Sequence, residues 1–550
     1  MALKHVSAVI VGAGAGGGVV AKELSAAGLR VAVLERGKWY SAADCRKDDL
    51  YNQRTSVLGN RFGPEEEGNP RVLVDDRGEH VLDPSDPGYS NNAACVGGGT
   101  FSYGAMAWRF LEKDFRMRTT YGAVEGSTLE DWPITYDDLE PYYEKAEWEM
   151  GVSGDDTSNV FKGPRKKPLP MRPLAPNKEY QVLRPAAERL GLHPFHIPML
   201  RNTEPYNGRR SCMRCRWCVG FACELNARTG THNTVIPTAL ATGNCELRTD
   251  CMAKEVLLDE RGRARGVAYF DANGRLQEQT ADLVIVSGGA VESARLLLNT
   301  RHKLFPNGLG NRYDWVGRNL QSHSYAGAVG QFDFDTYDDL GPGASIAICD
   351  YNHGNPGLAG GAMLANEFIR LPYQFMGLVP PWISPWGPEH KEFVRTAYKR
   401  TIVVTGPVQE MPVFDARVEV DPKVKDRWGI PVARLSGKKH PHTIEIARFI
   451  AGKAQDWLKE AGAINTWRRV PGPGLSGGQH QAGTCRMGND PKASVVDANC
   501  RIHDVDNVYV IDASSHVTNG GFNPVLTILA NAYRASENLI KTWKGANVRS

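Results

Sequence analysis

A glycine-rich turn near the N-terminus has the spacing of a dinucleotide-binding motif. Gly12, Gly14 and Gly17 form a GxGxxG pattern that follows a short β-branched apolar run and precedes a helix-like run. The first glycine permits the tight turn, the second lets the backbone approach a pyrophosphate, and the third lets the helix pack closely on the strand. Free N–H groups at the helix N-terminus then bind phosphate. We therefore predict a dinucleotide site here, and Ala15 and Gly16 belong to the same turn.

Acidic residues end two strand-like segments that lie far apart in the chain. The strand after the glycine-rich turn ends at Glu35, whose carboxylate can accept hydrogen bonds from a ribose diol, and Arg36 follows it. The glycine motif alone does not distinguish NAD from FAD. A second strand, 507–512, ends at Asp512 near the C-terminus. A second strand that ends in an acidic residue suits a long cofactor that needs contacts along its whole length. FAD is longer than NAD in this sense, so we favour FAD.

Cysteines are concentrated in one short segment. Four of the eleven fall there: Cys212, Cys215, Cys218 and Cys223. Thiolates at this density repel one another unless a cation or a cluster compensates them, and the C-x2-C-x2-C spacing resembles that of iron–sulfur ligands. Glu224 departs from the bacterial ferredoxin pattern, which has proline there. The spacing is short for a zinc ribbon. An iron–sulfur cluster, a structural zinc ion, a disulfide and free thiols all stay open as interpretations.

Basic residues surround this cysteine segment. They could offset the charge of an anionic cluster or dock an acidic partner, and they are Arg209, Arg210, Arg214 and Arg216. The odd number of cysteines argues against a disulfide framework and for a local cluster with its own purpose.

Composition limits the classes of partner. Hydrophobic residues make up 41% and charged residues 23% of the 550 residues, which is ordinary for a globular enzyme. The formal net charge of +3 gives no reason to expect nucleic acid or an anionic membrane as a partner. No apolar run reaches the ~18–20 residues of a membrane helix, so we expect no membrane span. The apolar stretch at the N-terminus continues into the glycine-rich turn without a small-residue cleavage site, so we expect a cytoplasmic protein.

The elements that must position these residues indicate an α/β fold with more than one domain. We expect a Rossmann-like FAD-binding domain built from 1–305 and 471–550, and an α+β substrate-binding domain with an antiparallel sheet over 306–470. The cysteine-rich segment 209–224 belongs to the first part. Segment 41–90 is polar and punctuated by glycine and proline, so we predict a loop that covers the cofactor.

The predicted substrate-binding domain alternates strand-like runs with one amphipathic helix. The strand-like runs are 325–334, 400–408 and 416–420, and the helix-like run is 442–462. This pattern is typical of an antiparallel sheet backed by helices.

Four segments, in the same order, resemble motifs of the glucose–methanol–choline oxidoreductase family. Besides the glycine-rich turn, they are CVGGGTFSYG (95–104), VIVSGGAVESARLLLNT (284–300) and the C-terminal stretch that begins GGQHQAGTCRMG (477–488) and ends at 540. The segment 132–154 is also similar to the sugar dehydrogenase and oxidase branch. The resemblance covers most of the chain, and four motifs in order are much more specific than any one of them.

This resemblance implies His480 as the catalytic base and Asn523 as its partner, a position that is histidine in other branches. It places Asn523 and Pro524 near the pyrimidine end of the flavin and Ala253 near its adenine. Further cofactor contacts are implied at Gly98, Gly99, Thr100, Ser102, Asp512 and Ala513. Some sugar-oxidising members have a histidine at the Ser102 position that bonds covalently to the flavin. Serine cannot form that bond, so we expect noncovalent FAD.

The predicted function is FAD-dependent oxidation of a CH–OH group of a sugar or glycoside to the carbonyl. The hydride would go to flavin N5 and the hydroxyl proton to His480, because histidine titrates near pH 6.5 and suits general-base catalysis. Asn523 is neutral and offers both a donor and an acceptor, so it can hold the substrate oxygen without competing for the proton. His323 and His516 also lie in or near family-like segments, and we expect both to be hydrogen-bonded structural residues.

Two other functions remain as alternatives. One is oxidation of a non-sugar alcohol, such as a sterol, or of an amino-sugar natural product. The other is an electron-transfer flavoprotein without an alcohol substrate, against which the His480–Asn523 pair argues. Electrons would leave to oxygen or to an external acceptor, either a protein or a small molecule. Some members of the sugar branch relay electrons through an iron–sulfur cluster in the region matched by the cysteine segment.

Overall fold

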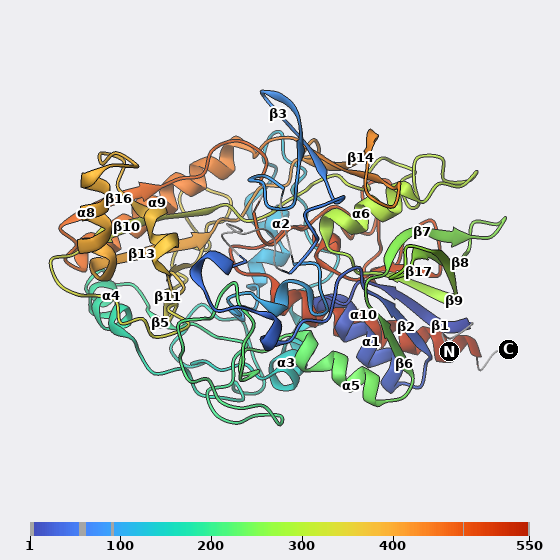
Figure 1. Ribbon diagram of the computed structural model, residues 1–550, viewed down its shortest axis with the longest axis horizontal. Coiled ribbons are helices and arrows are strands. Elements are labelled where there is room, and N and C mark those ends of the chain that lie inside the picture. Colours follow the sequence, from blue (N-terminus) through green and yellow to red (C-terminus); the bar gives the residue numbers. More distant parts are fainter. Residues whose placement is uncertain (1–4, 54–61, 90–92, 477, 548–550) are drawn as a thin grey trace.

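Three β-sheets organise the part of the chain that the computed structural model describes, which is residues 5–53, 62–89, 93–476 and 478–547. In Figure 1 the seven-stranded sheet lies at the right and the six-stranded sheet at the left. Strands of a four-stranded sheet lie at the top between them.

The seven-stranded sheet contains both strands that the glycine-rich turn was predicted to join. Its order is β6-β2-β1-β9-β8-β7, and β17 also pairs with β9. The strands are β1 (His5–Val11), β2 (Val31–Leu34), β6 (Cys245–Arg248), β7 (Met252–Leu258), β8 (Ala264–Phe270), β9 (Leu276–Val286) and β17 (Val508–Val510). The strands β1, β2, β6, β9 and β17 pair in parallel, whereas β7 and β8 are antiparallel. The β1 side chains Val6, Val9 and Ile10 are fully buried, as expected for a parallel strand covered on both faces.

Helices α1 (Ala15–Ala26), α5 (Val235–Ala241) and α6 (Ala290–Asn299) pack on strands of this sheet. Helix α10 (Val525–Asn547) packs on α1, and α3 (Tyr136–Met150) packs on α10. The first helix, α1, packs against α10 and α5, so the N-terminal and C-terminal segments lie side by side (Figure 1). This contact brings the glycine-rich turn next to the C-terminal segment that was predicted to be catalytic.

The six-stranded sheet is antiparallel throughout, with the order β16-β10-β13-β12-β11-β5. Its strands are β5 (Phe195–His196), β10 (Tyr325–Gln331), β11 (Ile346–Ile348), β12 (Leu364–Asn366), β13 (Thr401–Pro407) and β16 (Asn465–Arg469). Helices α4 (Lys178–Arg189) and α9 (Pro441–Glu460) cover one face. Helices α7 (Pro372–Phe375) and α8 (Pro388–Ala397) pack on part of the other face. The predicted antiparallel sheet and its amphipathic helix are confirmed.

Two expectations about strands were wrong. Segment 41–90 is not a loop throughout, because the four-stranded sheet contains β3 (Arg71–Asp75) and β4 (Gly78–Leu82) beside β14 (Arg417–Lys425) and β15 (Pro431–Ser436). The first two strands form a short hairpin that gains a partner only through the β3–β15 pairing, a long-range contact that local composition does not reveal. The pairing of β14 is likewise not visible in the local sequence, so this strand was wrongly predicted to belong to the antiparallel sheet of the substrate-binding domain. Residues 54–61 and 90 of that segment lie outside the described residues.

The predicted fold class is confirmed: a parallel nucleotide-type sheet is combined with an antiparallel sheet and helices. The remaining helix, α2 (Met117–Tyr121), is a short connection. The domain boundaries at 305 and 470 stay predictions. In the described part of the chain, we find no helix that is both long and apolar enough to cross a membrane.

Candidate active site

A single cavity of about 1140 Å³ extends from the glycine-rich turn to the antiparallel sheet. Of the residues predicted to bind the cofactor, those that line it are Gly12, Gly14, Ala15, Gly16, Glu35, Arg36, Gly98, Gly99, Thr100, Ser102, Ala253, Asp512, Ala513, Asn523 and Pro524. Gly17 is not among the lining residues. A Cβ on Gly17 would stand 2.0 Å from the Gly12 carbonyl oxygen, so this glycine serves the packing of the turn.

The start of α1 is shaped to receive a phosphate group. Gly12 has a φ of +100°, and a Cβ there would stand 2.4 Å from the Ser287 carbonyl oxygen, so the turn needs glycine. Gly14 is the N-cap of α1, with no side chain bonded to the cap. A Cβ on Gly14 would meet no protein atom within 4 Å, because this backbone faces the cavity. An open helix N-terminus with an unshielded backbone fits a pyrophosphate.

Glu35 is fixed by the loops on either side of it. Its carboxylate accepts hydrogen bonds from the Ala13 N–H at 2.8 Å and the Gly37 N–H at 2.9 Å. Burial raises the pKa of Glu35, and these backbone donors oppose that shift. Each carboxylate oxygen has a second lone pair, so the predicted ribose contact remains available. The neighbouring Arg36 lies 3.5 Å from the Glu292 carboxylate.

Asp512 ties the C-terminal segment to α6. One carboxylate oxygen accepts from the Gly289 N–H at 2.8 Å and the Ser293 hydroxyl at 2.6 Å, and the other accepts from the Ser514 N–H at 2.8 Å. In another lining segment, the Thr100 hydroxyl donates to the Gly97 carbonyl at 2.6 Å. These bonds hold two segments of the cavity lining in fixed conformations.

His480 and Asn523 meet at the sheet end of the cavity, as the family resemblance implies. The His480 Nε2 and the Asn523 Nδ2 are 3.5 Å apart, and that Nδ2 also donates to the Tyr325 hydroxyl at 3.1 Å. Among the described residues, the Asn523 Oδ1 is buried and has no hydrogen-bond partner. His480 has a φ of 68°, a conformation that non-glycine residues adopt mainly where the surroundings impose it. The Asn519 side chain, which donates to the His480 carbonyl at 2.7 Å, is part of those surroundings.

A second histidine determines which ring nitrogen of His480 carries the proton. The Nδ1 atoms of His323 and His480 are 2.9 Å apart, and the His323 Nε2 lies 2.8 Å from the Gly520 carbonyl oxygen. A carbonyl can only accept, so the His323 Nε2 carries the proton and its Nδ1 is an acceptor. The His480 Nδ1–H therefore donates to His323. This leaves the His480 Nε2 unprotonated on the side of Asn523.

Burial keeps this pair neutral. It lowers the pKa of His480 well below the ordinary 6.5, and the neighbouring His323 adds to the effect. Burial also lowers the pKa of His323. A neutral imidazole with a free Nε2 lone pair can accept a proton, whereas an imidazolium cannot.

Two site residues were not predicted as such: Tyr325 was missed, and His323 was expected to have only a structural role. His323 is the buried, hydrogen-bonded histidine that we expected, but its partner is His480 itself. Tyr325 follows two residues later on β10, and only its place in an alternating strand could have indicated that it faces the site. His516 is fully buried, with its Nδ1 3.3 Å from the Asn519 Oδ1, as expected of a structural histidine.

The cysteine segment lies apart from this cavity. A separate cavity of about 20 Å³ is lined by Cys212, Cys215, Cys218 and Cys223. Two buried arginines, Arg201 and Arg228, also line it, and the Arg201 Nη1 lies 3.6 Å from the Cys212 Sγ. The described part of the chain contains no three histidine, cysteine or acidic side chains arranged to hold a metal ion, and its cysteines are all free thiols. The residues therefore do not fit a metal site or a disulfide.

Comparisons with known proteins agree with the fold and the site. Family models described as GMC oxidoreductase match residues 88–325 and 412–532. The 6'''-hydroxyparomomycin C oxidase of Streptomyces lividus is 31% identical over 534 residues, which are 96% of this chain and 90% of that protein. The 2-methyl-1,2-propanediol dehydrogenase of Mycolicibacterium austroafricanum is 30% identical over 556 residues, 97% of this chain and 95% of that one. A pyridoxine 4-oxidase crystal structure from Mesorbium loti covers 97% of this chain and 98% of its own, with a TM-score of 0.61 at 17% identity.

The family match, the nucleotide-type sheet and the cavity that joins it to His480 agree with one another. The cofactor that this family binds is FAD, and its members oxidise CH–OH groups. The chain belongs to the GMC oxidoreductase family and is an FAD-dependent oxidoreductase.

Proposed function

We propose that this chain oxidises a CH–OH group of a sugar or glycoside to the carbonyl, with His480 as the base that takes the hydroxyl proton. The observation that carries the proposal is the meeting of the His480 Nε2 and the Asn523 amide, 3.5 Å apart, in the cavity whose other end fits a dinucleotide. When bound, FAD supplies the acceptor for the hydride that leaves the CH–OH carbon.

The hydrogen bonds around His480 suit it to a base. Its Nδ1–H donates to His323, so the unprotonated Nε2 can accept the proton of a substrate hydroxyl. Once protonated, the ring carries a positive charge, and the acceptor at the His323 Nδ1 stabilises it through a charge-assisted hydrogen bond. His323 is thus a positioning residue, because it acts through His480.

Asn523 is proposed to hold the substrate oxygen. Its Nδ2 donates one proton to Tyr325 and directs the second toward the His480 Nε2 at 3.5 Å, and its Oδ1 is an acceptor with no partner among the described residues. The amide is neutral, so it can bind either the hydroxyl or the carbonyl product. Tyr325 fixes the orientation of the amide.

A sugar-like substrate is supported by the relative that oxidises a hydroxyparomomycin, which is a glycoside. A second candidate is a small non-sugar alcohol, because the other relative is a dehydrogenase of 2-methyl-1,2-propanediol at nearly the same identity. Both relatives match almost the whole chain, so sequence similarity does not separate the two substrate classes.

The electron acceptor is proposed to be oxygen or an external molecule. Because the cysteine cavity does not assemble a metal site, we derive no electron relay through it. Iron and acid-labile sulfide analysis of anaerobically purified protein tests the predicted iron–sulfur cluster. The cytoplasmic location also stays a prediction, which fractionation of the source cells would test.

A substrate panel distinguishes these functions. Holoenzyme is mixed anaerobically with glycosides, free sugars and short diols, and bleaching of the flavin absorbance is followed. The sugar proposal expects faster bleaching by glycosides or sugars than by diols, and the reverse order supports the second candidate. If no alcohol bleaches the flavin, the oxidase or dehydrogenase function is wrong. Repeating the panel with oxygen and with an artificial acceptor identifies the class of acceptor.

A further inference from the structure

Among the described residues that line the cavity from the six-stranded sheet and its strand ends, one carries a carboxylate. Tyr325 of β10 and Thr405 of β13 line the cavity. The buried residues that alternate with them along these strands point to the opposite face of the sheet, toward helices α4 and α9. Glu367 directly follows β12 and lines the same cavity. Its N–H donates to the Val403 carbonyl at 3.0 Å, which places it beside β13. Glu367 is half-buried, whereas the neighbouring residues on both sides are buried.

The sheet register places Glu367 away from the reacting centre. Val403 pairs with Val329, which lies four residues along β10 from Tyr325. With about 3.3 Å per residue along a strand and about 4.8 Å between strands, the Cα atoms of Glu367 and Tyr325 are roughly 16 Å apart. A group that contacts Glu367 is therefore remote from the oxidised carbon and belongs to another part of the same substrate.

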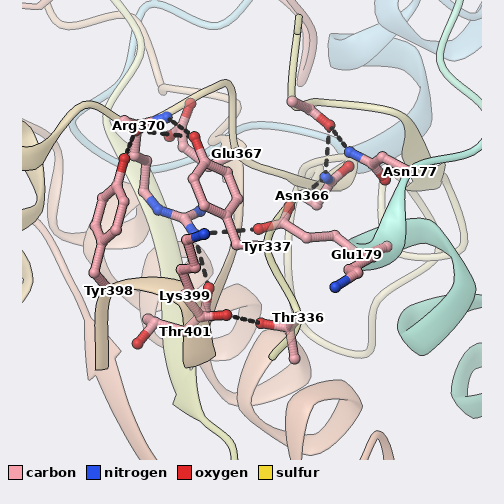
Figure 2. Close-up of polar contacts among 12 residues, drawn as sticks. Asn177, Glu179, Thr336, Tyr337, Asn366, Glu367, Arg370, Tyr398, Lys399 and Thr401 are labelled. Carbon is pink, nitrogen blue, oxygen red and sulfur yellow. Dashed lines mark hydrogen bonds and ion pairs between the residues drawn. The ribbon is translucent and has the colours of Figure 1, made fainter. Parts of the chain in front are cut away.

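Buried polar contacts hold the Glu367 segment on both sides (Figure 2). Asn366 donates to the Glu179 carboxylate at 2.6 Å and accepts from the Ile346 N–H at 3.0 Å. Arg370 donates to the same carboxylate at 3.2 Å and to the Thr401 carbonyl at 2.7 Å. A binding group held on a rigid element loses little conformational freedom when it binds.

Two carboxylates, Glu179 and Glu367, act on the single Arg370 guanidinium, and only Glu179 is ion-paired with it. In the described part of the chain no ion pair joins Glu367 to a basic residue. Its Oε1 accepts only the adjacent Phe368 N–H, at 2.9 Å. Arg469, which also lines the cavity, lies on β16, three strands away and offset by two residues along the strand direction, so the two Cα atoms are roughly 16 Å apart. A half-buried carboxylate of this kind favours a cation, which supplies both charge and donors.

We propose that Glu367 binds an ammonium group of the substrate, so that the substrate is an amino glycoside of more than one ring. This inference rests on the proposed function, because the reacting sugar must occupy the His480–Asn523 end of the cavity. The ammonium group lies on a second ring, and Glu367 selects the substrate without taking part in the chemistry.

The test compares three matched disaccharides: the disaccharide of glucosamine with the linkage of cellobiose, its N,N′-diacetyl form, and cellobiose. Binding to holoenzyme is measured by calorimetry, which does not depend on turnover. Glu367→Gln keeps the shape of the side chain and removes its charge. Glu389→Gln, an exposed position on α8, is the matched control.

We expect wild type to bind the amino disaccharide most tightly. Glu367→Gln should weaken that binding roughly 10- to 100-fold, the range for a hydrogen bond to a charged group, and should leave the two uncharged disaccharides almost unchanged. Glu389→Gln should match wild type. The inference is overturned if wild type does not prefer the amino disaccharide or binds none of the three. It is also overturned if Glu367→Gln weakens the binding of all three disaccharides equally, because that result is expected of a carboxylate that binds hydroxyl groups. Failure of every alcohol to bleach the flavin would overturn the proposed function instead.

Discussion

His323 and His480 face each other through their Nδ1 atoms, 2.9 Å apart, and only one of the two can carry the shared proton. The Gly520 carbonyl assigns it, because it requires the His323 Nε2 to be the protonated nitrogen. A backbone carbonyl therefore sets, through two rings, which nitrogen of His480 is free to act as a base. Hydrogen-bonded partners commonly fix the tautomer of a functional histidine in this way.

Removal of the acceptor on His323 should slow the chemical step. His323→Leu leaves the His480 Nδ1–H without its partner, and the loss of a buried hydrogen bond of about 1–3 kcal/mol corresponds to roughly 5- to 150-fold in rate. His323→Asn can place its Oδ1 near the lost Nδ1 and should recover much of this activity. Stopped-flow flavin reduction measures both. Equal rates in the Leu and Asn variants would mean that His323 only fills space.

Tyr325→Phe should loosen Asn523 without disturbing His480. The variant removes the hydroxyl that accepts from the Asn523 Nδ2 at 3.1 Å, and a net contribution of about 0.5–1.5 kcal/mol corresponds to a roughly 2- to 12-fold fall in kcat/KM. Steady-state kinetics with the best substrate of the panel measures it. An unchanged kcat/KM would show that the amide does not need this contact.

Gly14→Ala should release FAD from a protein that still folds. The new methyl group points into the cavity at the N-terminus of α1 and meets no protein atom within 4 Å. Gly12→Ala should instead destabilise the fold, because its φ is +100° and the Ser287 carbonyl stands in the way. Gly472→Ala, in open space on an exposed loop, is the control. Bound FAD per chain and thermal unfolding are measured. Full FAD occupancy in Gly14→Ala would contradict the phosphate site.

Acid should destabilise the protein through its buried histidines. Burial lowers the pKa of His516 from 6.5 to about 4, so below pH 6.5 the unfolded chain binds a proton that the folded chain does not. The free energy of unfolding therefore falls as the pH falls from 6.5 toward 4, by up to about 1.4 kcal/mol per pH unit for such a group. Denaturant unfolding at several pH values measures this. His516→Gln should lose less stability than wild type over that range, and an equal loss would contradict the assignment.

The catalytic rate, like the free energy of unfolding, should fall when the pH is lowered. The pKa of His480 lies well below 6.5, so its neutral form dominates at neutral pH. We expect kcat/KM to be flat from about pH 6.5 to 8 and to fall only on the acid side, as the base becomes protonated. A profile that still rises between pH 7 and 8 would indicate a base with a higher pKa.

Local sequence patterns were sufficient to predict the elements whose conformation depends mainly on residues close by in the chain. The β1–turn–α1 segment and helix α9 follow from apolar periodicity, and the cavity position of Gly14 follows from motif spacing. The approach of His480 to Asn523 followed from family resemblance, since nothing in local sequence joins residues 43 positions apart.

Features that depend on long-range contacts could not be predicted. The hairpin of β3 and β4 is stabilised beside β15, more than three hundred residues away in the chain. The tautomer of His480 depends on His323 and on the Gly520 carbonyl, which meet only in the folded chain. The cysteine spacing left an iron–sulfur cluster, zinc, a disulfide and free thiols open, because spacing does not determine where side chains point.

The most direct test of the central claim is anaerobic flavin reduction by the preferred substrate in wild type and in His480→Ala. The variant removes the Nε2 that we propose accepts the hydroxyl proton, and it leaves the residues at the glycine-rich turn in place. We predict that it retains FAD and reduces it about 10²- to 10⁴-fold more slowly than wild type does. Reduction at a near wild-type rate in a fully loaded His480→Ala enzyme would show that His480 is not the base.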